Sequence, residues 1–107
     1  TDRLLAESDA LMRANLGRRV DLATLARAAG LSRFHFAKRY KAVTGTSPIQ
    51  RFIHLKIERA CHLLDVTDAG VADVAAELGY DDPLYFSRVF RNVVGVSPRG
   101  YRMLRRG

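Results

Sequence analysis

Hydrophobic residues recur along the chain three or four positions apart, which is the spacing of one face of an α-helix. Leu22, Leu25 and Ala26 form one such stripe, and comparable stripes follow further along the chain. Strand signals are weak, because no Asn-Gly or Asp-Gly turn separates alternating apolar runs. The pattern predicts an all-α chain of about seven helices, with bounds good to about two to four residues. The expected helices span residues 3–16, 22–29, 33–44, 48–64, 71–78, 83–94 and 98–105.

Capping residues, prolines and glycines mark the expected ends of these helices. Each proline follows Ser or Asp, which is typical of an N-cap residue with proline in the first helical position. These pairs are Ser47-Pro48, Asp82-Pro83 and Ser97-Pro98. Glycine falls just after several helices, where a left-handed residue commonly ends a helix. Within the helices, the stripes place Phe36, Tyr40, Val43 and Ile49 toward a core.

One pattern of thirty-odd residues occurs twice. The first copy, residues 21–52, is DLATLARAAGLSRFHFAKRYKAVTGTSPIQRF, and the second, residues 70–102, is GVADVAAELGYDDPLYFSRVFRNVVGVSPRGYR. Matching positions lie 49 residues apart before the central turn and 50 apart after it, so the second turn holds one extra residue. Two copies are too few for a solenoid. The repeat indicates one binding element that the chain presents twice, to a partner whose structure also repeats.

The length and apolar content fit a single domain with its own core, covering residues 1–107. We expect a first subdomain at about 3–46, a linker helix at about 47–65 and a second subdomain at about 66–107. A helix over 48–64 would be ~25 Å long at 1.5 Å per residue. With the width of the flanking helices, this could hold the two copies of the repeat ~34 Å apart, which is about one turn of double-stranded DNA.

The net charge of +7 is concentrated in two blocks. Residues 32–56 and 83–107 each hold six bases and no acid, whereas residues 57–82 hold seven acids and one arginine. Such basic surfaces attract polyanions, chiefly nucleic acid or acidic membrane. No membrane helix or signal peptide is expected, because no apolar run approaches the ~20 residues that a membrane helix needs and the first 20 residues are polar. Binding to an acidic membrane surface would need lipidation or a basic amphipathic helix with exposed apolar residues, and neither is evident in the sequence. We expect a cytoplasmic, nucleoid-associated protein.

Each copy has the form of a helix-turn-helix: a short helix, a glycine turn and a second helix that opens at Ser32 or Asp82. In this motif the second helix enters the DNA major groove, and its N-terminal residues touch base edges. Phe36 and Phe86 mark the core face of that helix, and the opposite face is basic. Arg and Lys pair with guanine, Ser with several bases, and apolar side chains with the thymine methyl.

The second copy is similar to the signature of AraC/XylS-type bacterial transcription regulators, and LKIERACHLL resembles that family's connecting helix. The resemblance covers about residues 5–105. It implies two helix-turn-helix subdomains joined by one long helix, with both recognition helices in successive major-groove segments of double-stranded DNA. It also implies an effector-sensing or dimerisation domain in many relatives. We expect such a domain in the full-length protein, with RNA polymerase as a further partner. Lys56 stands where relatives usually carry arginine.

In the family, base contacts come from the outward face of each recognition helix. Carried over residue by residue, this predicts base reading by Arg33, Phe34, Ala37, Lys38, Pro83, Leu84, Ser87 and Arg88. Contacts to the DNA backbone are expected from their neighbours Ser32, His35, Lys41, Asp82, Tyr85 and Arg91.

Two other functions are compatible with the charge pattern. Charge-driven, nonspecific binding of RNA or DNA stays open, although few exposed aromatics are available for stacking. A protein-docking module, in which the acidic block 57–82 meets a sensor domain or RNA polymerase, also stays open. The histidines and Cys61 of the long helix are not expected to bind a metal, because ligands along one straight helix cannot surround a tetrahedral ion. We expect no enzymatic activity and no cofactor, since no phosphate loop, nucleophile elbow or metal-binding spacing occurs.

Overall fold

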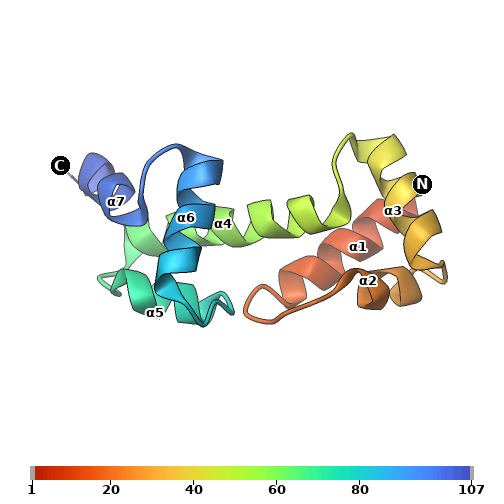
Figure 1. Ribbon diagram of the computed structural model, residues 1–107, viewed down its shortest axis with the longest axis horizontal. Coiled ribbons are helices and arrows are strands. Elements are labelled where there is room, and N and C mark those ends of the chain that lie inside the picture. Colours follow the sequence, from red (N-terminus) through yellow and green to blue (C-terminus); the bar gives the residue numbers. More distant parts are fainter. Residues whose placement is uncertain (1, 107) are drawn as a thin grey trace. The chain divides into compact units, whose positions relative to one another are not determined.

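The computed structural model describes residues 2–106, which form seven helices and no strand (Figure 1). The helices are α1 Asp2–Ala14, α2 Leu22–Ala28, α3 Arg33–Thr44, α4 Pro48–Val66, α5 Val71–Glu77, α6 Pro83–Val94 and α7 Pro98–Arg106. The all-α prediction is confirmed, and the helices that open after Ser32, Ser47, Asp82 and Ser97 begin where the sequence placed them. The largest differences are at two helix ends, because α1 stops two residues early and α4 runs two residues further than expected.

The helix ends follow the predicted capping chemistry. The Asp21 side chain accepts from the Thr24 backbone N–H at 2.9 Å and caps α2. Hydrogen bonding from Thr24 also lowers the pKa of this carboxyl. Gly45 and Gly95 end α3 and α6 with φ of 79° and 98°, in the left-handed region that favours glycine. In the second copy Gly70 takes the place of Asp21, so α5 begins without a side-chain cap.

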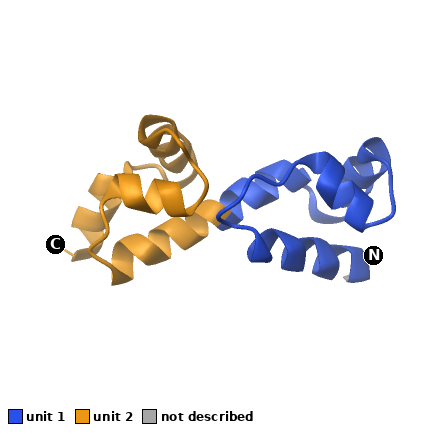
Figure 2. Cartoon of the chain, turned by 90° about the horizontal axis from the view of Figure 1, so that it is seen from below, with its two compact units in different colours: residues 1–55 blue, residues 56–107 orange. Residues whose placement is uncertain are grey.

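The chain divides into two compact units, residues 1–55 and 56–107 (Figure 2), and α4 contributes residues to both. In the first unit, α1, α2 and α3 enclose a core with the first half of α4. The core residues are Met12, Leu25, Ala26, Phe36, Tyr40, Phe52 and Leu55. At its edge Asp9 accepts from the Arg51 guanidinium at 3.0 Å and from the Tyr40 hydroxyl at 3.4 Å. One carboxylate therefore joins α1 to both α3 and α4.

The second unit builds its core from the second half of α4 together with α5 and α6. Its buried apolar residues are Ile57, Ala60, Leu63, Leu64, Val74, Ala75, Leu78, Phe86 and Phe90. The Phe86 and Phe90 rings lie 6.0 Å apart between centroids, and Tyr101 of α7 meets Phe90 edge-on at 5.8 Å. The unit thus closes around a row of aromatic rings.

Two residues that the helical stripes placed in the core are exposed. Val43 is 42% exposed and Ile49 is 38% exposed. Val43 lies in the last turn of α3 and Ile49 in the first turn of α4. A stripe identifies residues that share a helix face, but it does not say how far along the helix the neighbouring elements extend.

Candidate nucleic-acid interface

The recognition helices α3 and α6 follow turns with the same hydrogen bonds. In the first unit Leu31 N–H donates to the Ala26 carbonyl at 3.0 Å, and in the second Tyr80 N–H donates to the Ala75 carbonyl at 2.9 Å. The intervening Gly30 and Gly79 have φ of 70° and 82°. Because a left-handed residue is needed at this point, glycine is the residue that turns the chain without strain. The sequence repeat is therefore also a repeat of backbone geometry.

Each recognition helix buries one face and exposes the other. Phe36 and Tyr40 of α3 and Phe86 and Phe90 of α6 are at most 1% exposed. On the outward faces, the residues predicted to read bases are exposed, except for Ala37 and Ser87, which are half-buried. The structure thus brings the predicted base-reading set of each copy onto one accessible face of one helix. The residues are Arg33, Phe34, Ala37 and Lys38 on α3, and Pro83, Leu84, Ser87 and Arg88 on α6.

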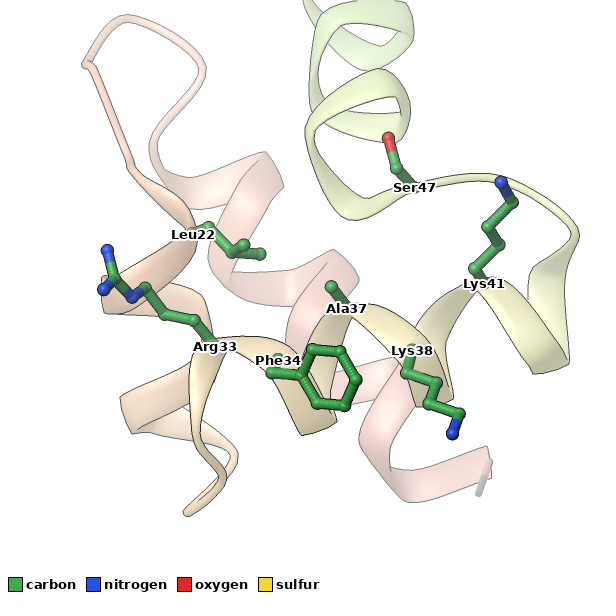
Figure 3. Close-up of a pocket in the computed structure, with 7 residues that line it drawn as sticks. All are labelled: Leu22, Arg33, Phe34, Ala37, Lys38, Lys41 and Ser47. Atoms are coloured by element: carbon green, nitrogen blue, oxygen red, sulfur yellow. The ribbon is translucent and has the colours of Figure 1, made fainter.

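The outward face of α3 borders a depression of about 520 Å³ (Figure 3). Its lining residues are Leu22, Arg33, Phe34, Ala37, Lys38, Lys41 and Ser47. The apolar side chains form a patch, with Arg33 and Lys41 toward opposite ends of it (Figure 3). Such a surface offers apolar contact and cationic hydrogen-bond donors together, as a base edge and its phosphates require.

Sequence reasoning missed Leu22 and Ser47 as parts of this surface. Leu22 is the first residue of α2, and Ser47 precedes α4 and accepts from the Gln50 backbone N–H at 3.1 Å. The cap position of Ser47 was visible in the sequence. That either residue approaches α3 depends on the fold of the unit, which no local pattern specified.

Both recognition helices hold a cation over an aromatic ring. Lys38 Nζ lies 5.8 Å from the centroid of the Phe34 ring, and the Arg88 guanidinium carbon lies 5.9 Å from that of Tyr85. The ring centroid of Tyr85 is itself 6.1 Å from that of Tyr80 in the preceding turn. Cation–π contact favours these positions by about 0.5–1 kcal/mol at exposed sites. The two long basic side chains are therefore biased in direction before any ligand binds.

The side chains that open the recognition helices act as caps. Ser32 Oγ accepts from the His35 backbone N–H at 3.2 Å and lies 3.1 Å from His35 Nδ1. The Asp82 carboxylate accepts from the Leu84 backbone N–H at 2.9 Å. A carboxylate also repels phosphate, so any contact of Asp82 with the DNA backbone has to overcome this repulsion. The other expected backbone-contacting residues, His35, Lys41, Tyr85 and Arg91, are exposed.

Five of the twelve bases in the two basic blocks form hydrogen bonds or ion pairs inside their own unit. Arg51 pairs with Asp9, and Arg105 pairs with Asp65 at 3.3 Å. Arg102 donates to the carbonyls of Leu64 and Thr67 at 3.1 Å each. Arg106 pairs with Asp68 at 2.8 Å and also donates to the Thr67 carbonyl. The fifth is Lys56.

Lys56 is buried, at 6% exposure, although it was counted with the basic surface. Its Nζ donates to the Leu78 carbonyl at 2.6 Å and lies 5.4 Å from the centroid of the Tyr80 ring. The lysine therefore binds the C-terminal end of α5, where helix carbonyls lack partners. A sequence signal existed, because Lys56 falls on the stripe that continues through Ala60 and Leu63. The other seven bases are exposed: Arg33, Lys38, Arg39, Lys41, Arg88, Arg91 and Arg99.

We expect Lys56→Met to lower the free energy of unfolding by about 1–3 kcal/mol, because the Leu78 carbonyl loses its buried donor while the apolar stem is kept. Urea denaturation measures this change. Lys41→Met is the matched control, since Lys41 is exposed and its loss should change stability by less than ~0.5 kcal/mol. A Lys56→Met variant as stable as the parent would contradict the structural role.

Two helix-turn-helix units, each with an exposed basic recognition helix, define a nucleic-acid-binding protein of the helix-turn-helix class. A family model described as "Helix-turn-helix domain" matches residues 25–103. The chain is 56% identical over 93 residues to the MmsAB operon regulatory protein of Pseudomonas aeruginosa, an alignment that covers 87% of this chain and 30% of that protein. It is 34% identical over 82 residues to the arabinose operon regulatory protein of Escherichia coli, covering 77% of this chain and 28% of that one.

Solved structures agree with this assignment. The DNA-binding domain of AdpA, crystallised in complex with a target DNA, has a TM-score of 0.88 and 35% identity, covering 95% of this chain and 92% of that one. An AraC-type regulator from Chromobacterium violaceum has a TM-score of 0.90 and 28% identity, covering 97% and 93%. The chain belongs to the AraC-type helix-turn-helix family of DNA-binding transcription regulators. It spans about 30% of the length of the curated relatives that it matches. Across residues 2–106, no helix has both the length and the apolar character needed to cross a bilayer.

Proposed function

We propose that the chain binds one specific double-stranded DNA site in transcription regulation, with α3 in one major-groove half-site and α6 in a second. The observation that carries this proposal is the matched pair of outward faces. Both recognition helices follow turns with the same hydrogen bonds, bury the same aromatic positions and expose basic side chains opposite. Because the two faces come from one chain and differ in sequence, the two half-sites need not be palindromic.

Within this proposal the exposed residues divide by chemistry. Lys38 and Arg88 occupy equivalent positions of the repeat and would pair with guanine edges. Phe34 and Leu84 offer apolar contact, and Ser87 offers a hydroxyl group. The neighbouring residues lie where contacts to the DNA backbone are expected. They are Ser32, His35, Lys41, Asp82, Tyr85 and Arg91.

The test of the proposed function is selection of binding sites from random duplex DNA. We expect enrichment of one site with two distinct elements, which footprinting should show as two protected patches at one chain per duplex. If no sequence is enriched and all duplexes bind according to their charge alone, the hypothesis of nonspecific binding would be preferred. A site that needs two chains would contradict reading of both half-sites by one chain.

We expect Arg88→Ala to lose ~1–3 kcal/mol of binding free energy and to relax selectivity in one half-site only. Lys38→Ala should relax selectivity in the other half-site to a smaller extent, because lysine lacks the planar, bidentate guanidinium group of arginine. Competition between single-base variants of the selected site measures both effects. Arg59→Ala is the control, since Arg59 is exposed on α4 within the acidic block. Equal weakening across all sequences would assign Lys38 and Arg88 to phosphates.

For the full-length protein we propose a cytoplasmic regulator in which this chain carries the DNA contacts. A sensor or dimerisation domain and RNA polymerase are its proposed protein partners. The acidic segment supports a docking role, because it holds seven acids and the side chains of Glu58 and Asp73 are exposed outside the two recognition helices. Replacing Glu58 with glutamine and Asp73 with asparagine should weaken polymerase recruitment in a transcription assay, whereas footprinting should show the same protected DNA site.

A further inference from the structure

The turn before the second recognition helix holds a tyrosine, Tyr80, whose position is fixed by three contacts. Its backbone N–H donates to the Ala75 carbonyl at 2.9 Å. Its ring centroid lies 5.3 Å from that of Phe86 in the core, and Lys56 Nζ lies 5.4 Å from the same centroid. Lys56 is itself held in place, because it is buried and donates to the Leu78 carbonyl at 2.6 Å. The Tyr80 ring is therefore anchored to both the core and α4.

Two further contacts lead from Tyr80 to the outward face of α6. The ring centroids of Tyr80 and Tyr85 lie 6.1 Å apart, and the Arg88 guanidinium carbon lies 5.9 Å from the Tyr85 centroid. Tyr85 is 51% exposed, whereas Tyr80 is half-buried and lies in the turn rather than on the recognition helix. Arg88 is thus connected through two aromatic rings to a residue that does not belong to the expected DNA-contacting set.

The first unit builds the same turn without this ring. Leu31 stands at the position of Tyr80, and its N–H makes the equivalent hydrogen bond at 3.0 Å. The ring near Lys38 is that of Phe34, which is 71% exposed on the outward face of α3. Since the turn forms with leucine, its backbone geometry does not require an aromatic residue. The ring of Tyr80 therefore serves something other than the turn.

An arginine reads guanine when two of its N–H groups align with the O6 and N7 atoms, so its guanidinium must be held in one orientation. Contact with an aromatic ring favours one orientation, and a group that is already oriented loses less freedom on binding. We infer that Tyr80 is a positioning residue for Arg88, which acts through the Tyr85 ring and sets how strictly the second half-site requires guanine. The inference rests on the proposed function, in which Arg88 pairs with a guanine edge.

The test measures base selectivity at the base pair of the selected duplex that Arg88→Ala identifies. Selectivity is the ratio of the Kd for a changed base pair to the Kd for the selected one, measured by fluorescence anisotropy at fixed salt. Tyr80→Leu introduces the residue of the first copy and should lower this ratio about two- to fivefold. Tyr80→Phe keeps the ring and should keep the parental ratio. Selectivity in the first half-site should stay parental in both variants.

Two controls separate positioning from a purely structural role. In an Arg88→Ala background, Tyr80→Leu should cause no further fall in the ratio, because the group that it positions is absent. Val74→Ala is the matched control, since Val74 is fully buried in the same unit and its truncation should lower thermal stability while keeping the ratio. Circular dichroism sets a measuring temperature below the melting of every variant. Tyr80→Met also lacks a ring and should repeat the result of Tyr80→Leu.

The outcomes distinguish this inference from the proposed function. If Tyr80→Leu and Tyr80→Met keep the parental ratio, or weaken binding to all duplexes equally, the positioning role is overturned while specific binding stands. A lowered ratio in Tyr80→Phe would assign the effect to the hydroxyl group, and a further fall in the Arg88→Ala background would mean that Tyr80 does not act on Arg88. Both results would also overturn the inference. Failure to select any site overturns the proposed function, and the positioning role falls with it.

Discussion

Phe86→Ala is expected to lower the free energy of unfolding of the second unit by about 3–5 kcal/mol. Phe86 is fully buried and lies 5.3 Å from Tyr80 and 6.0 Å from Phe90, measured between ring centroids. Truncation removes the ring that lies between Tyr80 and Phe90 and leaves a cavity under the N-terminal part of α6. The whole free energy of unfolding of a domain is about 5–15 kcal/mol, so this loss is a large part of it.

Thermal unfolding followed by circular dichroism measures this loss, and footprinting on the selected duplex reports which half-site is still bound. Phe36→Ala is the corresponding change in the first unit, since Phe36 is also fully buried. We expect each variant to lose protection mainly in its own half-site. Leu84→Ala serves as the exposed control and should melt like the parent. Parental melting of Phe86→Ala would mean that α6 does not depend on this core.

Binding to the selected duplex is expected to fall steeply with salt. If between four and seven of the exposed bases meet phosphates, log K against log[salt] should have a slope of about −4 to −6. The slope from all twelve bases would be near −11. Between 50 and 200 mM salt, the expected slope corresponds to a loss of a few hundredfold to a few thousandfold.

Single variants test which bases contribute. Arg91→Ala should make the slope shallower by about one, as expected for a phosphate contact. Arg105→Ala should leave it unchanged, because Arg105 pairs with Asp65. A parental slope shallower than about −2 would mean that the recognition helices are not the interface, and the protein-docking hypothesis would then be preferred. A slope near −11 would mean that the internal pairs open on DNA.

The sequence by itself determined the fold class and where most of the helices lie. Caps such as Ser32 and Asp82 and left-handed glycines such as Gly45 act on backbone groups within a few residues, so their effect can be inferred locally. The repeat then predicted that both helix-turn-helix units share one design, and the matching turn hydrogen bonds confirm this. The outward faces of α3 and α6 were also predictable, because a helix with one aromatic stripe exposes the opposite side. Which of these residues read bases stays a prediction.

Only the tertiary structure decided which charges are available to a ligand. Arg51 meets Asp9 across 42 residues, Lys56 meets the Leu78 carbonyl across 22, and Arg106 meets Asp68 across 38. Charge counting along the chain assigned all three bases to the surface. A count of charged residues gives the sign of each charge, but it does not show which group each side chain contacts. The exposure of Val43 and Ile49 was hidden for a related reason, since burial depends on what packs against a helix end. Long-range packing sets both properties, and among these residues only Lys56 carried a local signal, its place on the apolar stripe of α4.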